Sequence, residues 1–182
     1  MRAIVLLPFA AVIGCASAGT TSSGPGTQTV RVVSPTSTAS FAIPPTDPTR
    51  THELPYALEQ VWRALPGAFD ALGIPIGVMD PANRLAGNTG LKVRRQLKNV
   101  PLSRYIDCGG STQLGPNADS YDVNLSVVAA VRSVSPTVSS VSITFEAVGR
   151  PATFAQEYSQ CTSRGVLETR LMDAILSRLK GG

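Results

Sequence analysis

The sequence predicts an α+β fold, in which an antiparallel sheet is flanked by an N-terminal and a C-terminal helix on one face. Residues 121–131 and 137–148 alternate between apolar and polar side chains, as half-buried strands do. Residues 55–72 and 165–180 carry apolar side chains at three- and four-residue spacing, which is typical of amphipathic helices. A chain of 182 residues suffices for one such domain and a tail, but not for two full domains.

The amino-acid composition indicates which residues form the core and which class of partner is not expected. Lysine and arginine number 16 against 12 aspartates and glutamates, a net charge of +4. This mild balance does not indicate nucleic-acid binding, which usually needs a strong basic patch. Hydrophobic residues make up 43% of the chain and aromatic residues 5%, so we expect an aliphatic core with Trp62 as its one tryptophan.

The first predicted helix covers residues 55–72, and Pro66 is expected to kink or split it. Residues 74–79 then alternate as an edge strand should, because Pro75 cannot donate to a ladder. A turn follows at residues 80–83. The apolar stripe of the helix consists of Leu58, Val61, Trp62, Leu65, Phe69 and Leu72.

The middle of the chain is less regular. Residues 84–98 favour a strand, and residues 97–106 favour a short helix that Pro101 interrupts and that ends at Cys108.

A long antiparallel hairpin is the clearest β signal. Residues 121–131 and 137–148 form its strands, with a turn at residues 133–136. An extended segment then reaches Cys161, and residues 165–180 form the closing helix. The side chains expected to face the core are Tyr121, Val123, Leu125, Val127, Ala129, Val131, Val141, Ile143, Phe145 and Ala147 on the strands, and Val166, Leu167, Leu171, Ala174, Ile175 and Leu179 on the helix.

Cys108 and Cys161 form an even pair within the predicted domain. In an oxidising compartment such a pair indicates one disulfide, which would enclose about fifty residues. A reactive thiol or a metal pair is the alternative, but no further ligands occur at suitable spacing.

Cys15 stands apart from that pair. An apolar run over residues 3–13 follows Arg2, and because it is too short to span a bilayer it indicates an export signal. The run ends in Val12-Ile13-Gly14-Cys15, which resembles the lipobox of bacterial lipoproteins.

The resemblance implies cleavage between Gly14 and Cys15, a diacylglycerol thioether on Cys15 and acylation of the new amino terminus with a chain such as palmitate. Several acyl chains anchor a protein stably, whereas one holds it only marginally. Ala16 and Ser17 differ from the aspartate signal for inner-membrane retention, so the resemblance implies the outer membrane, with the protein facing the periplasm. The alternative is an ordinary signal peptide cleaved near Ala16-Ser17-Ala18.

We therefore divide the chain into a signal peptide (residues 1–14), a lipidated flexible tether (residues 15–50) and a single domain (residues 51–182). The tether is rich in Ser, Thr, Gly and Pro, and cannot bury enough apolar surface to offset the entropy of ordering it. Residues 30–33 form a β-prone island within it that could add an edge strand to the domain.

The domain has a looser resemblance of its own. The helix with Val61-Trp62, the Ile74-Pro75-Ile76 strand and residues 161–168 before the last helix are similar to the helix-grip domains of outer-membrane lipoproteins. Among these is the lipoprotein accessory component of the β-barrel assembly machinery. The resemblance implies a helix-grip-like arrangement and a scaffolding role, although one unit fits here where that lipoprotein carries two.

No group of residues has a pattern typical of catalysis or metal binding. His52 precedes the first helix as a solvated residue would, and Asn117, Asp119 and Asp122 lack the spacing of a calcium loop. Residues 87–90 lack the lysine of a phosphate loop and indicate a turn or bulge. We therefore expect no catalytic residue, no cofactor and no metal.

A cluster of basic residues is the one charge feature that is not random. It lies in a stretch, from position 81 to position 106, that contains no acidic residue. On a strand Lys92 and Arg94 would share one face, with Arg95 on the other. Two interpretations are open: contact with an anionic partner, or a solvated edge that charge protects from aggregation. The basic residues that form this feature are Lys92, Arg94, Arg95, Lys98 and Arg104.

The leading hypothesis is a non-enzymatic envelope lipoprotein, bound to the membrane through its lipid anchor, that binds or scaffolds a protein or other envelope component. The alternative is a carrier of a small apolar ligand in a cavity between the sheet and the terminal helix. A third hypothesis, an envelope hydrolase using serine and acidic residues, has only His52 and Ser177 as local grounds.

Overall fold

The computed structural model describes residues 28–34, 37–43, 51–113, 115–153 and 157–181, so the predicted signal peptide and Cys15 lie outside the described residues. It confirms the α+β class. The elements in chain order are β1 (Gln28–Ser34), β2 (Ser37–Ile43), β3 (Thr51–Leu54), α1 (Leu58–Ala71), β4 (Val78–Asp80), β5 (Leu85–Arg94), β6 (Gln96–Leu97), β7 (Val100–Pro101), η1 (Leu102–Arg104), β8 (Ile106–Asp107), β9 (Ser111–Thr112), β10 (Gly115–Pro116), η2 (Asn117–Asp119), β11 (Tyr121–Ser135), β12 (Val138–Pro151), β13 (Ser159–Ser163) and α2 (Val166–Lys180).

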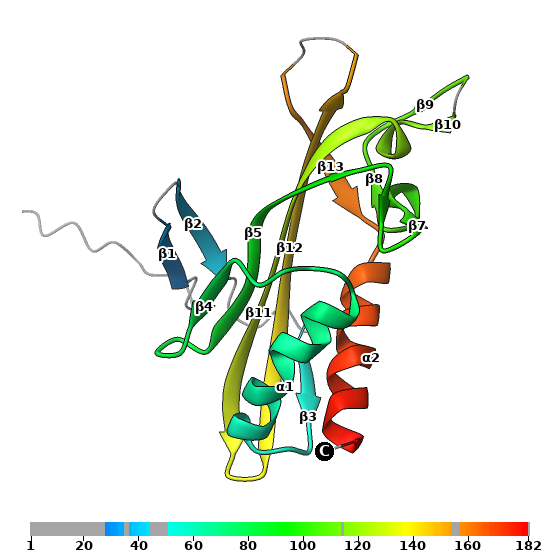
Figure 1. The fold of residues 1–182 in the computed structure, drawn as a ribbon. Coiled ribbons are helices and arrows are strands. Elements are labelled where there is room, and N and C mark those ends of the chain that lie inside the picture. The colour runs from blue at the N-terminus through cyan, green and yellow to red at the C-terminus, as the bar shows by residue number, and fades with distance from the viewer. Residues whose placement is uncertain (1–27, 35–36, 44–50, 114, 154–156, 182) are drawn as a thin grey trace, which may run out of the picture.

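The main sheet is antiparallel and has the order β7-β6-β5-β11-β12-β13-β8, with β3 also paired to β12 and β4 to β5. Figure 1 shows β11 and β12 running side by side along the length of the domain. The predicted hairpin is confirmed, with Val127 opposite Phe145 and Ala129 opposite Ile143. All strand side chains predicted to face the core are buried except Tyr121, which is half-buried.

The two helices pack against each other, and their buried side chains share one core cluster with those of the sheet (Figure 1). Pro66 lies inside α1 and does not split it, because the helix continues to Ala71. Burying one large aliphatic or aromatic side chain contributes about 1.5–3 kcal/mol to stability. The buried apolar faces of the two helices therefore supply most of the free energy that holds the helices on the domain. The buried helix residues are Val61, Leu65, Ala68, Phe69, Leu167, Leu171, Met172 and Ile175.

The edge strand predicted at residues 74–79 is shorter than expected and begins only at Val78. The side chain of Asn88 explains the difference, since its Nδ2 donates to the carbonyl of Pro75 at 2.8 Å, where a strand would use a backbone ladder. The turn predicted after this strand is confirmed.

The short helix predicted within residues 97–106 is a single 3₁₀ turn, η1. Residues before it form the small hairpin β6–β7, whose turn residues Lys98 and Asn99 have left-handed φ values of 47° and 63°. Val166 was expected on the inner face of α2, but it is 38% exposed because it is the first residue of the helix.

The residue 30–33 island does not add a strand to the main sheet. It lies in β1, which pairs with β2 in a separate two-stranded sheet. One edge position of the main sheet is instead taken by β3, which pairs with β12 between Ser139 and Ser142. The flexibility predicted for residues 15–50 stays a prediction.

Candidate functional site

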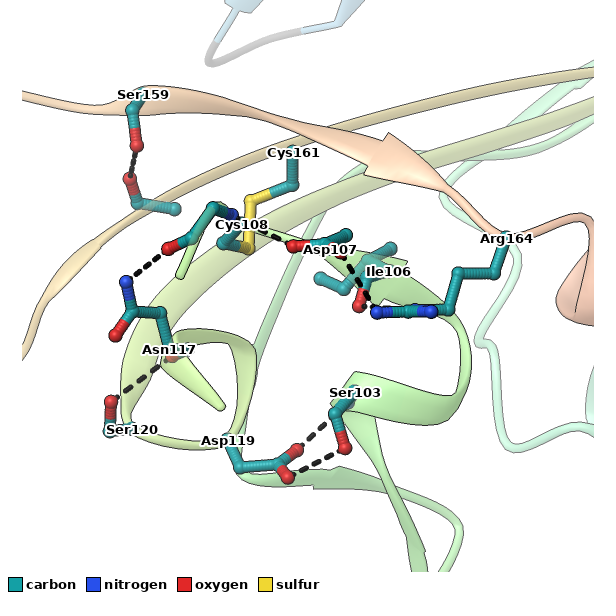
Figure 2. The surroundings of a disulfide bond; sticks show 12 residues. Ser103, Ile106, Asp107, Cys108, Asn117, Asp119, Ser120, Ser159, Cys161 and Arg164 are labelled. Atoms are coloured by element: carbon teal, nitrogen blue, oxygen red, sulfur yellow. Dashed lines mark hydrogen bonds and ion pairs between the residues drawn. A yellow bond between two sulfur atoms is a disulfide. The ribbon is translucent and has the colours of Figure 1, made fainter. Parts of the chain in front are cut away.

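The two domain cysteines meet where β13 passes the segment after β8 (Figure 2). Cys108 and Cys161 are bonded through sulfur at 2.05 Å and are both buried, which confirms the predicted disulfide. Gly149 on β12 lies against the bridge, because a Cβ added to it would come within 3.2 Å of Cys161 Sγ. Beside the bridge, Arg164 Nη2 pairs with Asp107 Oδ2 at 2.9 Å.

Hydrogen bonds tie the loops between β8 and β11 to this corner (Figure 2). Asp119 accepts from the backbone N and the Oγ of Ser103 at 2.8 and 2.7 Å, and Asn117 donates to the carbonyl of Gly109. Asp122 pairs with Arg94 on β5. These polar side chains therefore serve separate protein partners, and the described residues contain no group of three or more potential metal ligands.

Lys92 and Arg94 lie on the sheet face turned away from the helices, because Val93 between them packs against the main core. Both side chains are exposed. Arg94 Nε lies 3.5 Å from Asp122 Oδ1, and the two side chains are 57% and 42% exposed, so the ion pair contributes little to stability.

Lys98 is directed to the opposite side of the sheet. Its Nζ donates to the carbonyl of Ala71 in the last turn of α1. Because α1 has no basic residue in its own last turn, Lys98 supplies the cation that a helix C-terminus favours. The five basic residues that the sequence singled out therefore do not form one surface.

Lys92, Arg95 and Arg104 are exposed and make no ion pair with any residue that the structure describes. Arg95 occupies the bend between β5 and β6 with a φ of 64°. Its carbonyl accepts from Leu102 N at 2.9 Å, which fixes the bend that carries this side chain. The edge formed by β5, β6 and β7 thus presents cations that have no counter-charge of their own.

Sequence reasoning missed two residues next to this edge, Arg150 and Tyr158. Arg94, Asp122 and Arg150 are register partners across β5, β11 and β12. The Arg150 guanidinium lies 4.8 Å from the centre of the Tyr158 ring, which is 42% exposed. We call these four residues the outer-face row. The alternation of β11 and β12 would have been enough to predict that Asp122 lies opposite Arg150. Nothing in the sequence indicated the register of β5, so the position of Arg94 beside them could not be predicted.

The residues that suggested a hydrolase lie apart from any catalytic arrangement in the described part of the chain. His52 is an exposed residue of β3 opposite Val141, and Ser177 is exposed near the end of α2. Among the described helices, neither α1 nor α2 is long and apolar enough to cross a membrane.

A groove of about 380 Å³ lies between α1 and the last turn of α2. The carrier hypothesis expected a cavity between the sheet and the terminal helix, whereas this groove lies between the two helices. Its lining residues are Gln60, Arg63, Ala64, Gly67, Arg178 and Leu179.

Together these features define an α+β domain with a disulfide-linked corner and a basic sheet edge. No protein-family model matches the chain, and no curated protein matches it significantly in sequence.

Proposed function

We propose that the protein is a non-enzymatic binding or scaffolding module of a bacterial cell envelope, anchored by lipid on Cys15, that contacts an anionic protein or other envelope component. The observation that best supports this is the pair of exposed cations Lys92 and Arg95, which have no ion-pair partner among the described residues. A cation without a counter-charge keeps its attraction for a ligand and steers its approach.

The basic residues have different roles in this proposal. Arg94 already has Asp122 as its partner, and Lys98 already has the carbonyl of Ala71. The attraction for a partner therefore comes mainly from Lys92, Arg95 and Arg104. Arg150 and Tyr158 extend the contact surface, since arginine and tyrosine are enriched at protein interfaces.

The lipobox resemblance supports the anchoring part of the proposal. A lipid on Cys15 would hold the domain at a membrane surface, and residues 16–50 would let it reach a partner nearby. Such tethering raises the effective concentration of the domain for membrane-associated partners, so modest contacts are sufficient. The expected location is the outer membrane, with the domain in the periplasm.

Affinity capture of the full chain from detergent-solubilised envelope tests the proposal. We expect a partner that the wild type retains and that Lys92→Glu/Arg95→Glu loses by at least about tenfold, because each reversal replaces attraction with repulsion. Lys92→Glu alone should already weaken capture, whereas Lys180→Glu, which makes the same change at an exposed position at the end of α2, should leave capture unchanged.

Equal capture by the double variant and the wild type would refute the binding role of the edge. The anchor is tested separately, by labelling cells with palmitate: the wild type should carry the label and Cys15→Ser should not. An unlabelled wild-type chain would refute the lipoprotein assignment and leave the edge to be tested alone.

A further inference from the structure

The groove between α1 and α2 is a site of a different kind. Its volume of about 380 Å³ is within the range of small-molecule sites, which is about 300–1,000 Å³. One wall is a single stripe of α1, because its lining residues recur at spacings of three and four, and the last turn of α2 forms the other wall. The α1 residues of the stripe are Gln60, Arg63, Ala64 and Gly67.

Gly67 allows the guanidinium of Arg178 to lie flat against α1. A Cβ built on Gly67 would lie 3.1 Å from Arg178 Cζ and 3.2 Å from both its Nε and Nη1. These nearly equal distances mean that the plane of the guanidinium faces α1. Its N–H bonds lie in that plane, so they are directed along the groove and not into the helix.

The other polar groups of the groove also offer donors. Arg63 Nε donates to the carbonyl of Glu59 at 3.1 Å, and its two terminal nitrogens have no partner in the described part of the chain. Gln60 Oε1 accepts from Ala57 N at 3.1 Å, which leaves the side-chain amide nitrogen as a donor. No carboxylate lines the groove, and the neighbouring carboxylate of Glu59 is paired with Arg84.

We propose that this groove binds the carboxylate or phosphate group of a small amphiphilic molecule. Two guanidinium groups provide the planar, two-pronged donors that match such oxyanions. Ala64 and Leu179 provide apolar surface for a short hydrocarbon body. The inference is independent of the proposed function, because it concerns the helices and not the sheet edge.

Titration of the ¹⁵N-labelled full chain with octanoate, followed through amide chemical shifts, tests this. Octanoate should shift the amides of Gln60 and Gly67, and inorganic phosphate should bind more weakly and displace it. Arg63→Gln and Arg178→Gln should each weaken octanoate binding by about tenfold, which corresponds to loss of one charge-assisted hydrogen bond.

Two further variants separate the site from a general charge effect. Gly67→Ala keeps every donor but displaces the Arg178 guanidinium, so it should also weaken octanoate binding. Arg164→Gln removes an exposed arginine outside the groove and should leave octanoate binding unchanged. The inference is overturned if millimolar octanoate shifts no groove amide, or if octanoate binds no better than phosphate. It is also overturned if Arg63→Gln and Arg178→Gln, shown to be folded by circular dichroism, both bind octanoate like the wild type.

Discussion

Gly87 lies where β5 and β11 approach too closely for any side chain. A Cβ at this position would come within 2.1 Å of the carbonyl oxygen of Val127 and 2.7 Å of Val128 Cα, and both are backbone atoms that cannot rotate away. Gly87→Ala should therefore lower the free energy of unfolding by about 3 kcal/mol, as overpacking that moves backbone does. Gly90→Ala is the control. Gly90 lies in the same strand, but a Cβ added to it would have no neighbouring atom within 4 Å. Urea unfolding measures both, and equal stability of the two variants would contradict the close approach.

Asp80 holds the turn between β4 and β5. The side-chain amide of Asn83, which donates to Asp80 Oδ2 at 2.7 Å, is the main reason that the pKa of this carboxyl is lowered, and the backbone N–H groups of Asn83 and Ala82 add to it. The ionised form is favoured in the folded state, so its contribution to stability is present above the unfolded-state pKa of about 3.9 and is lost as the pH falls through the lower folded value.

Asp80→Ala should thus cost about 1 kcal/mol at neutral pH, and this difference from the wild type should shrink below about pH 4. Urea unfolding at several pH values measures it. Asn83→Ala should raise the pKa of Asp80 toward its ordinary value, which an NMR titration of the carboxyl resolves. A loss of stability in Asp80→Ala that is the same at neutral and at acid pH would show that the charge is not involved.

At the scale of elements, long periodic segments were predictable and short ones were not. The alternation in β11 and β12 and the stripes of α1 and α2 span many residues, so burial alone determines them. The segment from β6 to η1 depends instead on three left-handed residues, Arg95, Lys98 and Asn99, which have no distinctive sequence pattern. β3 was missed because four residues are too few to show alternation.

The β6–β7 hairpin supplies a prediction at this scale. Both residues of its turn, Lys98 and Asn99, have positive φ, as a type I′ turn requires, and glycine is favoured at the second position. Asn99→Gly should therefore stabilise the protein by about 0.5 kcal/mol. Lys98→Gly relieves the same backbone cost but removes the ammonium from the carbonyl of Ala71, so it should give no gain. Thermal unfolding compares them, and an equal gain in both would mean that the contact with α1 is unimportant.

For the whole molecule, the fold was largely predictable, while the candidate site was predictable only as a list of residues. Lys92 and Lys98 are close in sequence, yet the bends at residues 95–99 turn them to opposite sides of the sheet. Arg150 is distant in sequence but lies in the outer-face row because β12 pairs with β11. Register and turn geometry, which depend on backbone conformations that many residue types adopt, decide which charges meet.

The disulfide closes a long loop of the domain. Cys108 and Cys161 are 53 positions apart, and the chain between them contains the whole β11–β12 hairpin. In the chain-entropy treatment, closing a loop of this length stabilises the folded state by about 4 kcal/mol, mainly by restricting the unfolded chain.

The double variant Cys108→Ser/Cys161→Ser should lose about that much stability, and the wild type should lose it when reductant is present during urea unfolding. Reductant should not affect the double variant. Two free thiols per chain at these positions in protein purified without reductant would contradict the bridge, and an unchanged midpoint after confirmed reduction would show that the packing around Gly149 holds this corner without it.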